Sequence, residues 1–124
     1  MNRKVSTFII ALASATVAAA TANAATLPDG EYVCSLNPRM QLGSIWIKGN
    51  TYVGPGRDRG APSHRFELTG SGTINWSAPM GGMDTDGNRV IGTVLKDAGG
   101  GRTGFDIQFT TQAGRTQIAS CTPG

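Results

Sequence analysis

The residues that carry out most enzyme chemistry are scarce in this sequence of 124 residues, which contains one histidine, His64, and two cysteines, Cys34 and Cys121. A metal site needs several ligating side chains together, and a redox pair needs neighbouring cysteines, so neither is expected. A hydrolytic triad would require His64 to meet a buried acid, and Asp58 is the carboxylate that a loop could bring near it. No pair of carboxylates stands out for glycoside chemistry. The sequence therefore favours a protein that is not an enzyme and has no metal or cofactor.

Charge is also sparse, and part of it lies in the N-terminal segment. Arg3 and Lys4 precede an apolar run, and residues 22–24 fit the small-residue pattern of a cleavage site. We interpret residues 1–24 as a secretory signal peptide and 25–124 as a single all-β domain. Removing Arg3 and Lys4 from the 11 basic residues leaves 9 against 8 acidic ones, a net charge of +1. That balance gives no argument for binding nucleic acid or a membrane surface.

The alternative interpretation of the first 24 residues is a retained membrane helix. Their apolar run is short and rich in Ala, Ser and Thr, and no stop-transfer pattern follows it. No cysteine follows the cleavage site directly, so a bacterial lipid anchor is not indicated. We expect a periplasmic or secreted bacterial protein, without a stable membrane anchor after cleavage, that is a monomer.

The two cysteines predict a structural disulfide. An exported protein folds in an oxidising compartment, where an isolated pair of cysteines forms a bond. Cys34 and Cys121 lie near the two ends of residues 25–124, so their bond would close a loop of nearly the whole domain. The domain has few aromatic residues for a core, and small exported domains of this kind usually need such a link.

The stretch from Arg65 to Ser77 is the clearest local structure signal. Two runs of alternating apolar and polar residues flank Gly70-Ser71-Gly72, which is typical of a β-hairpin. The register predicts the cross-strand pairs Phe66–Trp76, Glu67–Asn75 and Leu68–Ile74. Apolar and polar pairs then fall on opposite faces of the hairpin.

Other short alternating runs are separated by turns rich in the 18 glycines and 6 prolines of the chain. Gly49-Asn50 predicts a type II′ turn that pairs Ile47 with Tyr52 and Trp46 with Val53. Gly92 predicts a bulge. The expected strands are 31–36, 44–48, 51–53, 65–69, 73–77, 89–96, 105–110 and 116–121. We predict a small antiparallel meander or closed up-and-down β-barrel of about eight short strands, with a two-sheet β-sandwich as the alternative.

The last expected strand leaves one conflict open. Cys121 shares a face with Ala119 and Gln117, whereas Ile118 resembles the core residue. Either a bulge or a different register in this strand would resolve the conflict.

Two loop segments match the sequence patterns of ligand-binding motifs, but each is better explained as a turn. Gly99–Gly104 fits Gly-x-Gly-x-x-Gly, but a strand rather than a helix is expected to follow, so a hairpin loop is favoured over a phosphate site. Asp84–Asn88 contains acidic residues at calcium-loop spacing, but positions six and twelve hold Arg89 and Leu95. We interpret the second motif as a turn.

Five residues are candidates for contact with a partner. Trp46 falls on the face of its hairpin opposite Ile47, and an exposed aromatic on a rigid strand suits binding; the alternative is that Trp46 is covered or belongs to the core. Arg57 and Arg59 lie in the polar loop 57–64, and Met80 and Met83 lie in the loop 78–88, where binding would require exposed side chains.

Several short stretches follow one another in a recognisable order: Gly30–Cys34, Ile45-x-Ile47-x-Gly49-x-x-Tyr52, Gly72-x-Ile74-x-Trp76-x-x-Pro79 and a late cysteine, Cys121. This order resembles small exported two-cysteine bacterial β-domains of uncharacterised function. It is also loosely similar to periplasmic lysozyme inhibitors of the C-type class, which pair a Tyr-x-Cys strand with a late cysteine in a small barrel. Their Ser-Gly-x-x-Tyr inhibitory stretch is not matched, because Thr73-Ile74 follows Ser71-Gly72, so no inhibitory residue is carried over.

Three functions follow in order of preference. The first is a non-catalytic binding module for a protein or small ligand. The second is a periplasmic or secreted inhibitor of an enzyme such as lysozyme, with Arg57-Asp58-Arg59 as the inserting loop. The third, a distant one, is a hydrolase using His64.

Overall fold

The computed structural model describes residues 26–124. The predicted signal peptide, residues 1–24, lies outside the described residues. Within residues 26–124, no helix is long and apolar enough to cross a membrane.

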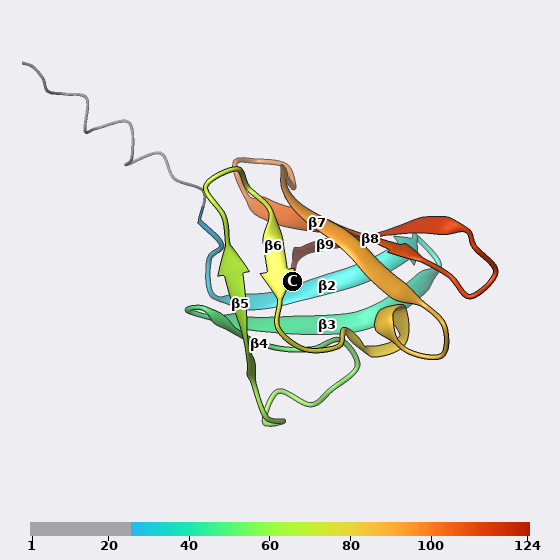
Figure 1. Ribbon diagram of the computed structural model, residues 1–124. Coiled ribbons are helices and arrows are strands. Elements are labelled where there is room, and N and C mark those ends of the chain that lie inside the picture. The colour runs from blue at the N-terminus through green and yellow to red at the C-terminus, as the bar shows by residue number, and fades with distance from the viewer. Residues whose placement is uncertain (1–25) are drawn as a thin grey trace, which may run out of the picture.

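The described chain is built from antiparallel strands and one short 3-10 helix (Figure 1). The strands are β2 (Gly30–Asn37), β3 (Met40–Lys48), β4 (Thr51–Val53), β5 (His64–Leu68), β6 (Ile74–Trp76), β7 (Arg89–Asp97), β8 (Thr103–Thr110) and β9 (Thr116–Pro123), and the 3-10 helix is η2 (Gly81–Asp84). They form one eight-stranded sheet in the order β6-β5-β4-β3-β2-β9-β8-β7. The all-β prediction is confirmed, and the sheet is a nearly closed barrel rather than the alternative sandwich.

The sheet is an up-and-down meander whose first and last strands pair. β2 pairs with β9, so the chain ends meet inside the sheet. The weak point lies between β6 and β7, which are joined by the single bridge between Thr73 and Val94. The backbone N–H of Leu95 donates to the carbonyl of Gly72 at 2.8 Å there, and the indole Nε1 of Trp76 donates to Thr93 Oγ1 at 2.7 Å. These contacts almost complete the barrel.

The predicted disulfide is confirmed. Cys34 and Cys121 are bonded, are direct cross-strand partners on β2 and β9, and have Cα atoms 4.0 Å apart. Both are fully buried in the core. The bond therefore joins the two strands whose pairing closes the sheet.

Both predicted hairpin registers are confirmed. β5 and β6 pair Phe66 with Trp76, Glu67 with Asn75 and Leu68 with Ile74. β3 and β4 pair Trp46 with Val53 and Ile47 with Tyr52. The predicted bulge near Gly92 is present too, because the register of β7 against β8 shifts between Val90 and Gly92.

The core is a cluster of aromatic and aliphatic side chains inside the curled sheet. Trp76 packs edge-on against Tyr52, with ring centroids 4.7 Å apart, and against Phe105 at 5.7 Å. Phe105 also contacts Tyr32, at 5.3 Å. These contacts connect the β5–β6 hairpin to β2 and β8, so the hairpin finds the partner for its apolar face that an isolated ribbon lacks.

In the last strand, β9, the structure places Ala119 and Cys121 in the core and Ile118 on the outer face. Ala119 and Cys121 are fully buried, whereas Ile118 is 52 % exposed. β9 pairs with β8 without a register shift, so alternation alone turns Ile118 outward. The expectation that Ile118 is a core residue is wrong, because the disulfide fixes which face of β9 turns inward.

Several strands are longer than expected, and β3 is extended the most. β3 begins at Met40 rather than Ser44, and it follows β2 after a short turn at Pro38. The pairing of β2 with β3 shifts register on both sides of Ser35. Such irregular pairing interrupts the alternation of apolar and polar residues from which strands are predicted.

Candidate functional site

The candidate site lies on the outer face of β3 and β4. Ile47 and Tyr52 turn into the core, where they are nearly fully buried, so their neighbours Trp46 and Val53 turn outward. The expectation that Trp46 faces away from the core is confirmed, and its side chain is partly buried.

A loop covers this outer face. After Val53 the chain runs through residues 54–63 before β5 begins. The guanidinium carbon of Arg59 lies 5.3 Å from the centroid of the Trp46 ring, which is cation–π geometry. Val53 is buried although it is not part of the main core cluster, and it lines the same hollow as Trp46 and Arg59.

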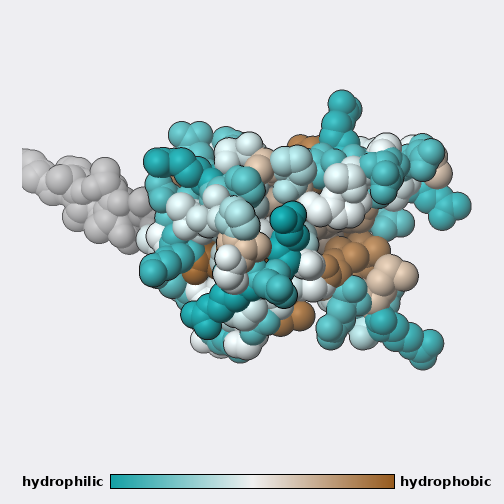
Figure 2. Space-filling model, turned by 90° about the horizontal axis from the view of Figure 1, so that it is seen from below, coloured by the Kyte–Doolittle hydropathy of each residue, from teal (hydrophilic) through white to brown (hydrophobic). Residues whose placement is uncertain are grey.

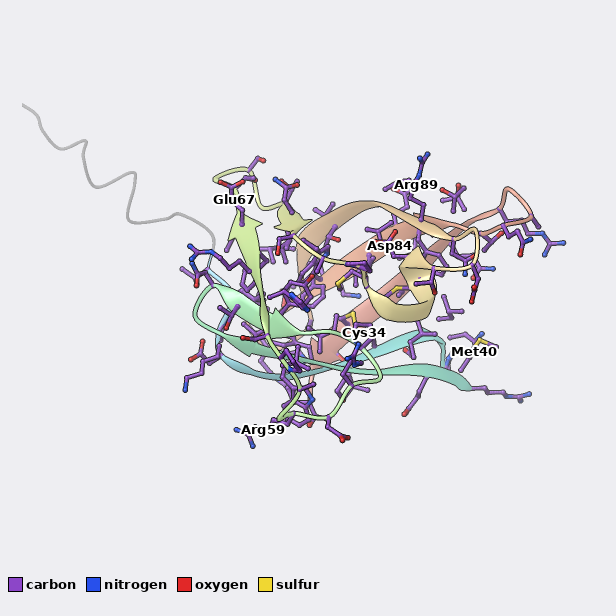
Figure 3. All side chains as sticks on the ribbon, turned by 60° about the horizontal axis from the view of Figure 1, so that its bottom comes forward. Cys34, Met40, Arg59, Glu67, Asp84 and Arg89 are labelled. Atoms are coloured by element: carbon purple, nitrogen blue, oxygen red, sulfur yellow. A yellow bond between two sulfur atoms is a disulfide. The ribbon has the colours of Figure 1, made fainter. Side chains whose placement is uncertain are left out.

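The loop is shaped by its own backbone. The N–H of Arg57 donates to the carbonyl of Gly54 at 3.3 Å, and the N–H of Ala61 donates to the carbonyl of Asp58 at 2.8 Å. These two turns carry Arg59 back over the strand. Arg59 lies at the bottom of the molecule in Figure 3, far from Arg89. The molecule seen from below has a mostly hydrophilic surface broken by small apolar patches (Figure 2).

A hollow of about 480 Å³ lies beside the Trp46–Arg59 pair. Its charged and polar walls come from Asp29, Lys48, Thr51, Arg59 and Ser63. The carboxylate of Asp29 accepts a hydrogen bond from the backbone N–H of Gly49 at 2.8 Å, which occupies one of its oxygens. Two cationic side chains against one carboxylate give the hollow an excess of positive charge. We call this surface the Trp46–Arg59 hollow.

Tyr52 is among the residues that line the hollow, but its side chain turns into the core on the other face of the sheet. Burial raises the pKa of Tyr52 above its ordinary value. The backbone N–H of Ala78, which donates to the Tyr52 phenol oxygen at 3.1 Å, opposes the rise, and the nearby charge of Asp84 adds to it. The hydroxyl donates to the carbonyl of Ala78 at 2.8 Å. Because this hydroxyl is paired with the Ala78 backbone in the core, Tyr52 holds β4 in place and is not a reactive group of the hollow.

The other sequence candidates lie elsewhere. Arg57 is exposed on the same loop but is not part of the hollow's lining. Met80 and Met83 are 0 % and 3 % exposed, so the expectation that these side chains are exposed for binding is wrong. The reason is that η2, which contains Met83 and directly follows Met80, folds against the barrel, so both side chains join the core cluster.

His64 is exposed at the start of β5, and its ring centroid lies 6.0 Å from that of Tyr52. Within residues 26–124, no hydrogen bond or ion pair joins the His64 side chain to a carboxylate, and no group of three or more His, Cys, Asp or Glu side chains could hold a metal ion.

Two side chains of the acidic loop 84–88 are hydrogen-bonded to backbone groups of neighbouring segments. Asp84 Oδ1 accepts from the N–H of Val90 at 3.3 Å. Asn88 donates to the carbonyl of Gly82 at 2.7 Å and accepts from the N–H of Gln112 at 2.9 Å. Asp86 has a positive φ of 54°, as a tight turn requires. The interpretation of this motif as a turn is confirmed.

The glycine motif is a hairpin loop between β7 and β8. The N–H of Ala98 donates to the carbonyl of Arg102 at 2.7 Å, and the N–H of Arg102 donates to the carbonyl of Gly99 at 3.0 Å. A strand follows the motif, as expected.

One polar cluster was missed by the sequence analysis. Lys96 on β7 forms an ion pair with Asp106 on β8, Nζ to Oδ1 at 2.7 Å, and also contacts the hydroxyl of Ser120 on β9. These residues lie far apart in the sequence, and only the register of the three strands brings them together. The cluster links neighbouring strands on the outer face.

Comparison of the chain with protein-family models, with curated proteins and with solved structures finds no match.

Proposed function

We propose that this domain is a non-catalytic binding module that captures a partner protein through the Trp46–Arg59 hollow. The observation that carries the proposal is the position of the Arg59 guanidinium over the Trp46 ring, 5.3 Å from its centroid, on an outer face of the barrel. Trp and Arg are the side chains most enriched among residues that dominate binding energy.

The stacking prepares both side chains for contact. A cation–π pair at an exposed site contributes roughly 0.5–1 kcal/mol, which restrains two side chains that would otherwise be ordered only on binding. A stacked guanidinium keeps its N–H donors at the ring edge, where they can make paired hydrogen bonds to a carboxylate. Lys48 lies in the same hollow and adds a second positive charge. We therefore expect the partner to present an acidic side chain beside an apolar one.

The proposed location is outside the cytoplasm. The buried disulfide between Cys34 and Cys121 is consistent with an oxidising extracellular compartment. We propose that the module works in the periplasm or after secretion, and that its partner is found there.

The proposal is tested by capture with matched variants. Immobilised protein is exposed to periplasmic and culture extracts, and bound proteins are identified by mass spectrometry. Trp46→Ala and Arg59→Ser should each lose most of the partner that the unmodified chain retains. Arg115→Ser is the control, because Arg115 is an exposed arginine in the loop between β8 and β9 and its loss changes the net charge equally.

Equal retention by all three variants would refute the proposed surface. If the retained partner is a secreted enzyme, its turnover with and without the domain decides whether the binding is inhibitory. If the unmodified domain abolishes that turnover and the Trp46→Ala and Arg59→Ser variants do not, the domain is an enzyme inhibitor, which is the second function proposed from the sequence.

A further inference from the structure

A second pocket opens at the end of the barrel where the β2–β3 turn, η2 and the β8–β9 ends meet. Its volume is about 420 Å³, within the range of roughly 300–1,000 Å³ that small-molecule sites occupy. Its apolar wall is formed by Leu36, Leu42, Met80, Met83 and Phe109. Neither Trp46 nor Arg59 lines it, so this barrel-end pocket is separate from the Trp46–Arg59 hollow.

Close backbone packing builds the side of this pocket. A Cβ atom on Gly43 would lie 2.8 Å from the backbone nitrogen of Gly56, so the segment after β4 crosses β3 in direct contact. Pro55, buried in that segment, forms part of the pocket lining. The pocket is therefore bounded by tightly packed backbone on one side and by η2 on the other.

The apolar lining is not fully covered by the protein itself. Leu36 and Leu42 pack against the core but are only partly buried. In the view from below, apolar surface appears on the right, the side on which the β2–β3 turn lies in Figure 1 (Figure 2). A bound apolar group would remove this surface from water, which is favourable by about 25 cal/mol per Å².

The rim of the pocket is polar but carries no charge. Among its lining residues there is no Asp, Glu, Lys, Arg or His. Thr111 Oγ1 already accepts from the N–H of Arg115, and the amide of Asn88 is hydrogen-bonded to backbone groups. Gln41 on β3 is exposed and Gln117 on β9 is partly buried, and among the hydrogen bonds within residues 26–124 none involves either side-chain amide.

We propose that the barrel-end pocket binds one small neutral molecule that has an apolar body and at least one group that hydrogen-bonds to an amide. An ionised ligand would lose hydration there without meeting an opposite charge, which is costly. The unpaired amides of Gln41 and Gln117 supply a donor and an acceptor on either side of the apolar wall. Met80 and Met83 have flexible, polarisable side chains that adapt to irregular ligands.

The first test uses a neutral and an anionic probe with one shared skeleton. N-phenyl-1-naphthylamine is neutral, and 8-anilino-1-naphthalenesulfonate adds a sulfonate to it. The full chain is labelled with [methyl-¹³C]methionine and titrated with each probe. The neutral probe should shift the Met80 and Met83 signals saturably and Met40, which is exposed and outside the pocket lining, much less. The anion should bind at least about ten-fold more weakly, a difference of roughly 1.4 kcal/mol.

Binding of the anion as strong as that of the neutral probe, or equal shifts at all three methionines, would overturn the proposal. So would the absence of saturable binding by the neutral probe.

The second test places a charge in the pocket. Leu42→Lys puts an ammonium among the lining residues, and because Leu42 is only partly buried the longer side chain can reach water. It should weaken binding of the neutral probe by about ten-fold or more, since desolvating the new charge opposes binding. Ile118→Lys is the control, because Ile118 is 52 % exposed and does not line the pocket. It should bind the probe as the unmodified chain does.

Equal binding by Leu42→Lys and the unmodified chain would place the probe elsewhere and refute the site. Trp46→Ala should leave probe binding unchanged, so the failure of this inference and the failure of the proposed partner surface are separate outcomes.

Discussion

Cys34 and Cys121 lie directly opposite each other on β2 and β9, with their Cα atoms 4.0 Å apart. They join the strands nearest the two ends of the described chain. The opposite seam, between β6 and β7, is held by one backbone bridge and a side-chain hydrogen bond from Trp76 to Thr93. The barrel is therefore closed covalently where the chain ends meet and only weakly on its other side.

Replacing both cysteines by serine should destabilise the domain substantially. The bond spans 87 positions, and for a loop of that length the chain-entropy account gives about 4–5 kcal/mol. Since a domain of this size has a free energy of unfolding of roughly 5–15 kcal/mol, the double variant should be partly unfolded or easily denatured. Denaturation in urea measures the loss, and mass spectrometry of the unmodified protein should show two hydrogens fewer than the reduced chain. Free thiols in the native protein would contradict the role given to the bond.

Trp76 should contribute to stability through both packing and its indole N–H. Trp76→Ala removes contacts with Tyr52, Phe66 and Phe105. Because Trp76 is only partly buried, the cost should be about 3 kcal/mol, the lower end of the range for a fully buried ring. Trp76→Phe keeps a ring but leaves the buried hydroxyl of Thr93 without its donor, so about 1–3 kcal/mol is expected. Urea denaturation of the two variants measures both numbers. Equal stability of the two variants would show that the seam hydrogen bond, not the packing, dominates.

Two substitutions at neighbouring positions can test which side chains of β9 point into the core. Ile118→Thr changes an outward side chain and should alter the free energy of unfolding by no more than about 0.5 kcal/mol. Ala119→Leu forces a larger side chain into the core, where Ala119 is fully buried, and should destabilise by about 1–3 kcal/mol. The reverse order of these effects would mean that the register of β9 is shifted by one residue.

Alkaline pH should weaken the fold through its tyrosines. Burial raises the pKa of Tyr32 and of Tyr52 above the ordinary value of 10.0, and nearby aspartates add to both shifts. Above pH 10.0 the folded chain then holds more protons than the unfolded chain, so the free energy of unfolding falls as pH rises. Because the chain has only two tyrosines, phenolate absorbance in the folded protein should rise later than in the unfolded protein. Coincident titration curves would contradict this prediction.

Local features were predictable from the sequence because short turns fix them. The short turns Gly49-Asn50 and Gly70-Ser71-Gly72 fix the number of loop residues in each hairpin, and the loop length sets the register of the two strands. The pairs Ile47–Tyr52 and Phe66–Trp76 were therefore predictable. The disulfide also followed, since a chain with two cysteines has one way to pair them within itself.

Features that depend on distant packing were not predictable. Met80 and Met83 stand in a long loop without periodicity, and only the fold of η2 onto the barrel end shows that they are buried. Ile118 was misplaced because hydrophobicity favoured it over Ala119 as a core residue. The contact between Arg59 and Trp46 depends on the path of an irregular loop, for which the sequence carries no local signal.

The most direct test of the proposed function is site-specific photo-crosslinking in the cells that make the protein. p-Benzoyl-phenylalanine is placed at Ser63, an exposed residue of the Trp46–Arg59 hollow, or at Gln108, an exposed residue of β8 that lies outside it. Irradiation should yield a discrete crosslinked product from Ser63 and none from Gln108, and Trp46→Ala should remove the product. A product from Gln108 alone, or a Ser63 product unaffected by Trp46→Ala, would contradict the claim that this hollow is the binding surface.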